Sequence, residues 1–213
     1  MTVRVQSTWV RPPSPVADGL RIGLLGGSFN PAHEGHLHAS DLALKTLGLD
    51  YVWWLVSPQN PLKPERGMAD FAARLAGAKA FARNPRIVVT GIEAELGTRY
   101  TIDTLHTLER RFPQLRFVWL MGSDNLVQFP RWRNWRAIFA AVPIAVIARP
   151  GSALAARRAK AALVFEAAFH PPTYEFPALS PPVWTVLDSA KRSRVSASEI
   201  RRASPLAGLT RLW

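Results

Sequence analysis

The 213-residue sequence contains no cysteine and has no long apolar run. Without cysteine the chain has neither a disulfide framework nor thiolate chemistry, which suits a reducing compartment. The longest apolar run, Phe139–Ala148, is about half of the roughly 20 residues that a membrane-spanning helix requires. Residues Met1–Val10 include Arg4 and lack the apolar core of a signal peptide. We therefore expect a cytoplasmic protein that does not associate with a membrane.

Acidic residues are also few, so the chain is strongly basic. Lysine and arginine together number 27 against 15 aspartate and glutamate residues, which gives a formal net charge of +12. Such a charge attracts nucleotides, nucleic acids or acidic lipids, and it does not choose among them. Basic residues cluster at Arg131–Arg136, Arg157–Lys160 and Lys191–Arg202 without forming one long run. For Arg157–Lys160 we favour a solvated surface.

The order of apolar segments predicts an α/β fold. Short apolar runs indicate strands, and apolar residues at helical spacing indicate the helices between them. Strands that alternate with helices imply a doubly wound parallel sheet, with strands buried on both faces. The expected strands are Leu20–Leu25, Tyr51–Val56, Arg86–Val89, Arg116–Met121, Ile144–Ile147 and Trp184–Leu187, and the expected helices are Leu37–Leu47, Ala69–Arg83, Thr101–Arg111, Trp135–Ala140 and Ala153–Phe169.

We expect two parts in the chain, divided at residue 20. Residues 1–19 hold three prolines and no periodicity, so we expect a flexible Pro-rich arm that is dispensable for chemistry. Residues 20–213 should form a single domain, because the apolar fraction of 48% is enough for one core. Its small C-terminal helical part begins at a capping box formed by Ser196 and Glu199, after a Pro-rich loop at His170–Val183.

The most informative segment is Gly26–His36, GGSFNPAHEGH, at the junction of the first strand and helix. Gly26 and Gly27 carry no Cβ, so the backbone there can approach a phosphate closely. His33 and His36 are one helical turn apart and can point the same way. The helix that follows offers free N–H groups and the positive end of its dipole. These features together predict a phosphate-binding and catalytic site.

Other functional motifs do not fit this segment. No Gly-Lys follows the glycines, as a Walker A loop requires, and the dinucleotide pattern G-x-G-x-x-G is missing. His33–His36 is one residue shorter than the zinc-protease motif H-E-x-x-H. His36 and His38 have no cysteine or carboxylate cluster nearby in the sequence, so we expect no protein-bound metal. A glycine-rich turn with two solvated histidines is the alternative.

Two further segments are candidates for the same site. The fourth strand ends in Gly122, Ser123 and Asp124, and parallel strands end at one edge of a sheet, where doubly wound folds bind ligands. A plain turn residue is the alternative for Asp124. In the last helix, Ser198 and Arg201 could hold a triphosphate together with backbone amides, although an ordinary capped surface helix has the same pattern.

Five segments in this order resemble the bacterial nicotinate-nucleotide adenylyltransferases of the nucleotidyltransferase superfamily, whose signature is H-x-G-H. The resemblance covers roughly Leu20 to Ala203 and includes a late S-x-T-x-x-R-type motif, in which Ser198 replaces the usual threonine. Pro130 departs from the pattern, because the family usually has histidine there. The five segments are Gly26–His36, Ser57–Lys63, Tyr100–Leu105, Met121–Leu126 and Phe129–Trp135.

This resemblance implies an activity in NAD biosynthesis. The family transfers the adenylyl group of ATP to nicotinate mononucleotide, which gives nicotinate adenine dinucleotide and pyrophosphate. The mononucleotide phosphate attacks the α-phosphorus in line, so the enzyme positions the reactants and stabilises charge. By resemblance, His36 stabilises charge on the α-phosphate, His33 contacts the phosphates, and Arg201 takes the β- and γ-phosphates. Mg²⁺ would be carried mainly by ATP.

The resemblance also implies the two binding sites. Backbone amides near Thr101 would receive the pyridine carboxylate, and Trp132 would stack on the ring. Nicotinamide mononucleotide or another phosphorylated acceptor is the enzymatic alternative, and a basic RNA-binding module is the non-enzymatic one. We do not expect nucleic acid as a partner, and a homo-oligomer stays open. The implied ATP-binding residues are Gly26, Gly27, Ser28, Phe29, His33, His36, Gly122, Asp124, Ser196, Ser198 and Arg201, and those for the mononucleotide are Asn30, Lys63, Thr101 and Trp132.

Overall fold

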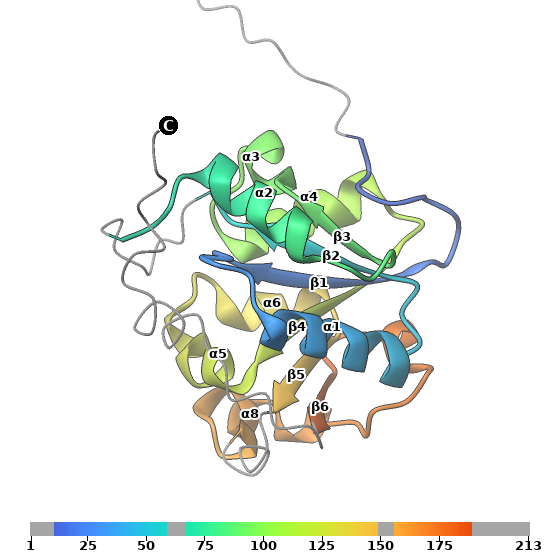
Figure 1. Ribbon diagram of the computed structural model, residues 1–213. Helices are drawn as coiled ribbons and strands as arrows, with labels where there is room; N and C mark the ends of the chain where they lie inside the picture. The colour runs from blue at the N-terminus through green and yellow to red at the C-terminus, as the bar shows by residue number, and fades with distance from the viewer. Residues whose placement is uncertain (1–10, 59–66, 149–155, 189–213) are drawn as a thin grey trace, which may run out of the picture.

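The protein is built on a parallel six-stranded sheet with the strand order β3-β2-β1-β4-β5-β6 (Figure 1). The computed structural model describes residues 11–58, 67–148 and 156–188. The strand order reverses between β1 and β4, as in a doubly wound fold, so the predicted fold class is confirmed. The strands are β1 Arg21–Gly27, β2 Tyr51–Val56, β3 Ile87–Thr90, β4 Arg116–Gly122, β5 Ile144–Ala148 and β6 Trp184–Asp188.

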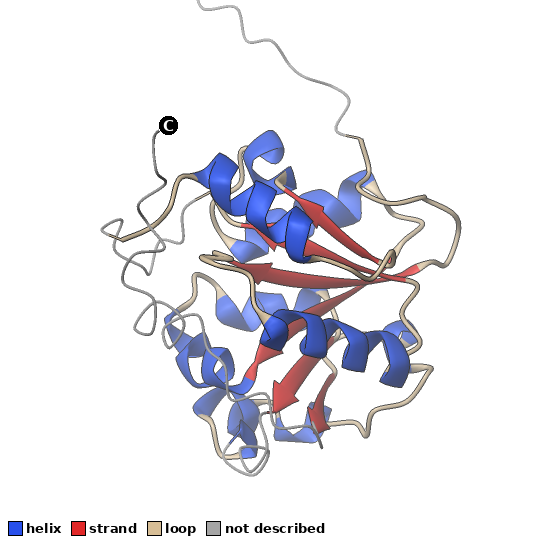
Figure 2. Ribbon diagram, viewed as in Figure 1, coloured by secondary structure: helices blue, strands red, loops and turns tan. Residues whose placement is uncertain are grey.

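Helices cover both faces of the sheet (Figure 2). Successive strand residues point to opposite faces, so Trp53 packs in one core and Trp54 in the other, each with 0% exposure. No helix in the described ranges has the length and apolar character needed to cross a bilayer. The α-helices are α1 Glu34–Thr46, α2 Phe71–Phe81, α3 Ile92–Leu96, α4 Thr101–Arg111, α5 Ser123–Gln128, α6 Trp135–Ala141 and α8 Lys160–Val164, and the 3₁₀ turns are η1 Phe129–Arg131, η2 Glu166–Ala168 and η3 Phe176–Ala178.

The expected helix Ala153–Phe169 is wrong for the residues described. Ala156 and Arg157 are helical, the helix is interrupted at Arg158 and Ala159, and α8 then ends at Val164. Phe165 leaves the helix because its ring stacks on Phe139 at a centroid distance of 4.0 Å, while its carbonyl oxygen accepts a hydrogen bond from Trp184 Nε1 at 2.7 Å. Tertiary packing therefore overrides the helical propensity of an alanine-rich segment.

Part of the expected flexible arm packs against the domain, through Ser14, Val16 and Gly19. Ser14 is buried, and its hydroxyl accepts a hydrogen bond from Trp53 Nε1 at 3.0 Å. Val16 lies against the core on the same face of the sheet, and the Gly19 amide donates to the carbonyl of Gln114. The expectation of a free arm is therefore corrected for residues 11–19. The domain boundary at residue 20 stays a prediction.

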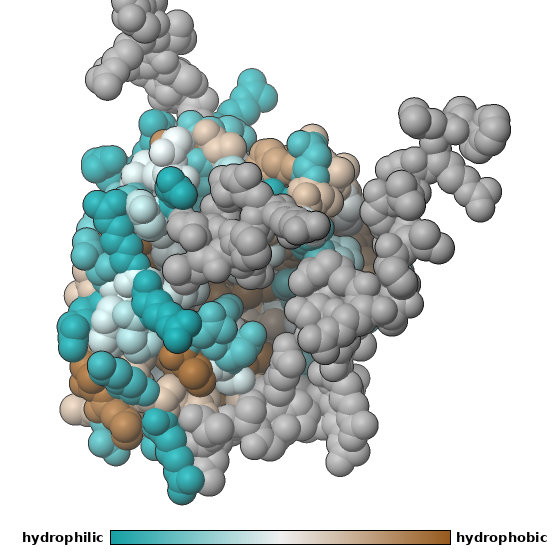
Figure 3. Space-filling view, turned by 90° about the vertical axis from the view of Figure 1, so that its left-hand side faces the viewer, coloured by the Kyte–Doolittle hydropathy of each residue, from teal (hydrophilic) through white to brown (hydrophobic). Residues whose placement is uncertain are grey.

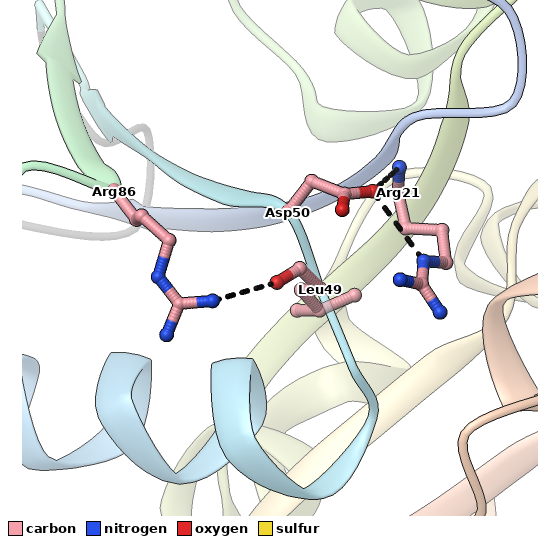
Figure 4. A network of polar contacts seen from close by, with 4 residues as sticks. All are labelled: Arg21, Leu49, Asp50 and Arg86. Atoms are coloured by element: carbon pink, nitrogen blue, oxygen red, sulfur yellow. Dashed lines mark hydrogen bonds and ion pairs between the residues drawn. The ribbon is translucent and has the colours of Figure 1, made fainter.

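A polar network ties the chain together at the amino ends of β1 and β2 (Figure 4). The Arg21 amide and Nε both donate to Asp50 Oδ2, at 2.7 and 3.4 Å, and Arg86 donates to the carbonyl oxygen of Leu49 at 3.4 Å. The ion pair is about one-third exposed, so solvent screens it and its contribution to stability is small. This network lies at the opposite end of the strands from Gly26 and Gly27, the last two residues of β1.

Candidate active site

A cavity of about 360 Å³ opens at the carboxyl ends of β1 and β4, where the strand order reverses. Figure 3 looks onto this edge and shows a recess with hydrophobic surface between hydrophilic groups. The walls come from the ends of β1, β2 and β4 and from the starts of three helical segments. The lining residues are Gly26, Gly27, Ser28, Ser57, Glu93, Arg99, Tyr100, Thr101, Trp119, Asn125, Arg131, Trp132 and Arg133.

The glycine turn, which comprises Gly26, Gly27 and Ser28 at the end of β1, lies directly against an aromatic side chain. A Cβ on Gly26 would lie 2.7 Å from Cη2 of Trp119, which is closer than real Cβ atoms approach other atoms. A Cβ on Gly27 would lie 3.3 Å from the ring of Phe29. Gly26 is therefore required by the packing of Trp119 as well as by the approach of a ligand to the backbone.

His33 and His36 form a reciprocal cap at the start of α1. The Gly35 amide donates to His33 Nδ1 at 3.1 Å, and the His33 amide donates to His36 Nδ1 at 3.2 Å. A ring nitrogen that accepts an amide N–H carries no proton, so each neutral imidazole carries its proton on Nε2. The ring centroids are 3.9 Å apart. The cap therefore orients both Nε2–H donors and explains why α1 begins at Glu34 rather than at the expected Leu37.

The ring of Phe29 packs against the ring of His36. Phe29 is 2% exposed, and its ring centroid lies 4.6 Å from that of His36 and 5.1 Å from that of Trp54. Phe29 adopts a positive φ of 45°, a sparsely populated conformation for a non-glycine residue. Its side chain does not line the cavity, so any contact of Phe29 with ATP would come from its backbone.

Arg74 of α2 joins two loops of the site, and sequence reasoning missed it. Its Nη1 donates to the carbonyl oxygens of Ser28 and Ser57 at 2.7 and 2.8 Å, and its Nη2 donates to that of Pro58 at 2.8 Å. Arg74 is 4% exposed, and this burial lowers the pKa of its guanidinium, partly offset by Asp70. An arginine one turn before the buried Ala78, on the same helix face, was the available signal.

Asn30, expected to contact substrate, uses its side chain in a second loop contact. Its Nδ2 donates to the carbonyl oxygen of Gly67 at 3.0 Å, and its Oδ1 accepts from the Ala69 amide at 3.4 Å. Arg74 Nε donates to the Ala69 carbonyl oxygen at 2.9 Å. Asn30 and Arg74 therefore both bind the backbone of Gly67–Ala69, the residues that precede α2.

The first residues of α4 form the opposite wall of the cavity. The helix begins at Thr101 as expected, and its N-cap is Tyr100. No side chain in the described part of the chain caps α4, which leaves its first amides available to an anion. Trp132 lies beside this helix start in the cavity wall, whereas Trp135 is 8% exposed and belongs to the core.

Glu93 is a buried carboxyl in this wall, and sequence reasoning did not identify it. Its Oε1 accepts a hydrogen bond from Thr104 Oγ1 at 3.1 Å. Burial raises the pKa of the Glu93 carboxyl from 4.5 to about 7, and the hydrogen bond from Thr104 acts in the opposite direction. The arginines that line the same cavity are Arg99, Arg131 and Arg133, and Arg133 lies 4.6 Å above the Tyr100 ring.

The structure brings several predicted residues together and separates others. Gly26, Gly27, Ser28, Thr101 and Trp132 line one cavity. Asp124 is exposed on α5 and is not a lining residue, whereas the next residue, Asn125, is. Gly122 packs beside Asp124, whose Oδ1 lies 2.5 Å from the position of a Cβ at residue 122. The predictions for Lys63, Ser196, Ser198 and Arg201 lie outside the described residues.

Comparisons with known proteins agree on one family. The cytidylyltransferase-like family model matches residues 24–203. The "Probable nicotinate-nucleotide adenylyltransferase" of Parvibaculum lavamentivorans is 57% identical over 185 residues, which is 86% of this chain and 92% of that protein. The Gluconobacter oxydans protein of the same name is 51% identical over 187 residues, covering 86% and 95%.

A solved structure shares the fold. The nicotinic acid mononucleotide adenylyltransferase of Plasmodium falciparum, complexed with NaAD, superimposes with a TM-score of 0.66. The match covers 86% of this chain and 83% of that one at 18% sequence identity. At this identity the likeness concerns the architecture of the sheet and its helices.

Proposed function

This chain belongs to the cytidylyltransferase-like family, and we propose that it is a nicotinate-nucleotide adenylyltransferase of NAD biosynthesis. It transfers the adenylyl group of ATP to nicotinate mononucleotide and releases pyrophosphate. The observation that carries this assignment is the cavity that joins the glycines at the end of β1 to the start of α4. One end suits phosphates, and the other suits an aromatic acid.

At the phosphate end, the protein positions the reactants and stabilises charge. A phosphate oxygen of the mononucleotide attacks the α-phosphorus, and the bond from that phosphorus to the β-phosphate oxygen breaks. The electron pair leaves with pyrophosphate, and the enzyme forms no covalent bond. The capped orientation of His36 supports a role for its Nε2–H as donor to the α-phosphate, with His33 and the glycine-turn backbone beside it.

Mg²⁺ is proposed to enter with ATP rather than to sit in a protein cage. The residues that line the phosphate end, Gly26, Gly27, Ser28 and Ser57, include no carboxylate, the side chain through which proteins usually hold Mg²⁺. Among the described residues, no group of three or more His, Asp and Glu side chains could hold a metal ion. The ion would neutralise charge on the phosphates, while the protein residues orient them.

At the acceptor end, a carboxylate is the group that the walls favour. The free amides at the start of α4 and the positive end of its dipole attract an anion. Arg99, Arg131 and Arg133 add positive charge to the same cavity. Trp132 offers an aromatic face to the pyridine ring. Ser196, Ser198 and Arg201 for the triphosphate, Lys63 for the mononucleotide, and the cytoplasmic location stay predictions from the sequence.

The amide mononucleotide is a second candidate acceptor because Glu93 lines this cavity. An ionised Glu93 would repel a substrate carboxylate and could accept a hydrogen bond from a carboxamide NH₂. A protonated Glu93 would not repel the carboxylate and could donate its O–H to it, while its carbonyl oxygen could still accept from an amide. The ratio of kcat/KM for the acid to kcat/KM for the amide therefore depends on whether Glu93 is ionised or protonated when the substrate binds.

Pyrophosphate release from ATP, measured with each acceptor, tests the assignment. We expect release with nicotinate mononucleotide and a kcat/KM for the amide lower by roughly 10⁴-fold, because the helix amides would be left without a charged partner. CTP in place of ATP is the control for the nucleotide. Equal kcat/KM for acid and amide would widen the function to both acceptors, and no release with either would overturn it.

A further inference from the structure

The indole N–H of Trp119 is a buried donor with no acceptor within the described part of the chain. Trp119 lies on β4 and is 2% exposed. A buried donor that loses its water and finds no partner costs about 1–3 kcal/mol. Native proteins rarely leave such groups unpaired, so an unpaired one in a cavity wall calls for a partner that arrives with the ligand.

The ring of Trp119 lies between the two ends of the cavity. Trp119 lines the cavity together with Gly26 and Trp132. Its Cζ2, which shares a bonded neighbour with Nε1, lies 3.1 Å from the position of a Cβ on Gly26. Its ring meets that of Trp132 edge to face at a centroid distance of 6.2 Å and an angle of 81°. The benzo edge of the indole, with Cη2 and Cζ2, thus faces the end of β1 beside the aromatic wall, and Nε1 follows Cζ2 after one shared carbon atom.

We propose that Trp119 Nε1–H donates a hydrogen bond to an oxygen of the bound mononucleotide, making Trp119 a substrate-binding residue. This inference rests on the proposed function. The mononucleotide is favoured over ATP because Trp119 shares its wall with Trp132 and Thr101, at the acceptor end. Gly26 completes the arrangement, since any larger residue there would displace the indole edge.

Replacing tryptophan by phenylalanine tests this bond, because Trp119→Phe removes the N–H and keeps an aromatic ring. We expect the KM and the calorimetric Kd for nicotinate mononucleotide to rise roughly 10-fold, as for a hydrogen bond to a charged group. The KM for ATP and kcat should change by less than about 2-fold. Thr185→Val is the matched control, since Thr185 Oγ1 is also buried without a partner but lies on β6, outside the cavity lining.

Nuclear magnetic resonance of the ¹⁵N-labelled wild-type protein gives a readout that does not require turnover. Trp119→Phe identifies the indole resonance by its disappearance. That resonance should move downfield when nicotinate mononucleotide is added and stay in place with a non-hydrolysable ATP analogue alone. An unmoved resonance, or an unchanged mononucleotide Kd in a Trp119→Phe protein that is folded, would overturn the proposal.

The same experiments separate this proposal from the proposed function. If the wild-type protein releases pyrophosphate with nicotinate mononucleotide but Trp119→Phe binds it equally well, only the role of Trp119 fails. If the wild-type protein neither turns over nor binds this mononucleotide, the proposed function fails, and the assignment of Trp119 fails with it.

Discussion

Arg74 Nη1 lies 2.7 Å from the carbonyl oxygen of Ser28, so this buried arginine of α2 holds the glycine turn of the site. The same nitrogen donates to Ser57, which follows β2. One guanidinium therefore fixes the distance between two loops that line the cavity. Its hydrogen bonds all go to backbone carbonyl oxygens, so Arg74 acts on the site through the backbone.

We expect Arg74→Lys to lower both stability and activity. Lysine keeps the charge but cannot donate in a planar fork to several carbonyl oxygens. Loss of these contacts should lower the free energy of unfolding by about 2 kcal/mol and kcat/KM by roughly 10-fold, measured by urea unfolding and pyrophosphate release. Arg83→Lys is the control, because Arg83 is exposed just after the same helix. Equal effects of the two substitutions would contradict this role for Arg74.

His36 allows its two ring nitrogens to be tested separately. Asparagine can place an oxygen near the position of Nδ1, and glutamine can place an NH₂ near the position of Nε2. We expect His36→Asn to keep the cap on α1 and the unfolding temperature, while kcat falls roughly 10²–10³-fold with a smaller change in KM. His36→Gln should lose the cap and retain more turnover. Near wild-type kcat in His36→Asn would remove His36 from the chemistry.

The sequence predicted the sheet well because each strand is a short apolar run that tertiary contacts reinforce. All six observed strands overlap their predicted ranges, and β2 agrees at both ends. Helices α3 and α5 were missed because five or six residues are too few for a helical period to show. The start of α1 was missed because histidine is outside the usual set of N-cap residues.

The candidate site was predictable where backbone chemistry defines it and not where packing does. Glycines before a helix predicted the phosphate end. Thr101 lies at a helix start as expected, and it is the first helical residue, one position after the N-cap Tyr100. The helical phase of α5 decides that Asn125 rather than Asp124 lines the cavity, and no local pattern gives that phase. Glu93 and Arg74 depend on contacts between distant loops and helices, which periodicity does not report.

Glu93 should make the stability depend on pH. Its pKa is raised from 4.5 to about 7, so the folded state holds the proton more tightly than the unfolded state does. Between these values folding takes up a proton, and stability is lost as the pH rises. From pH 5.5 to 8 this group should lower the free energy of unfolding by about 2 kcal/mol.

The matched variants isolate this effect from other titrating groups. Glu93→Gln keeps an oxygen that can accept from Thr104 and removes the titration, so its urea-unfolding free energy should fall less between pH 5.5 and 8 than that of the wild type. Glu95→Gln, on an exposed position of the same helix, should behave like the wild type. Parallel pH dependences for wild type and Glu93→Gln would contradict the raised pKa.

The contact between Ser14 and Trp53 determines how much of the N-terminal segment can be removed. Ser14→Ala would leave the buried Trp53 Nε1–H without its acceptor, which should cost about 1–2 kcal/mol and lower the unfolding temperature by roughly 3–6 °C. A chain that begins near Asp18 should lose at least as much stability, because the packing of Val16 is lost with it. Removal of residues 1–10 alone retains these contacts and is the matched control.

Since residues 11–19 are not among those lining the cavity, all three proteins should keep the wild-type kcat/KM below their unfolding temperatures. Circular dichroism melts and pyrophosphate release measured on the same preparations test both statements, and an unchanged melt for Ser14→Ala would show that the hydrogen bond contributes nothing to stability.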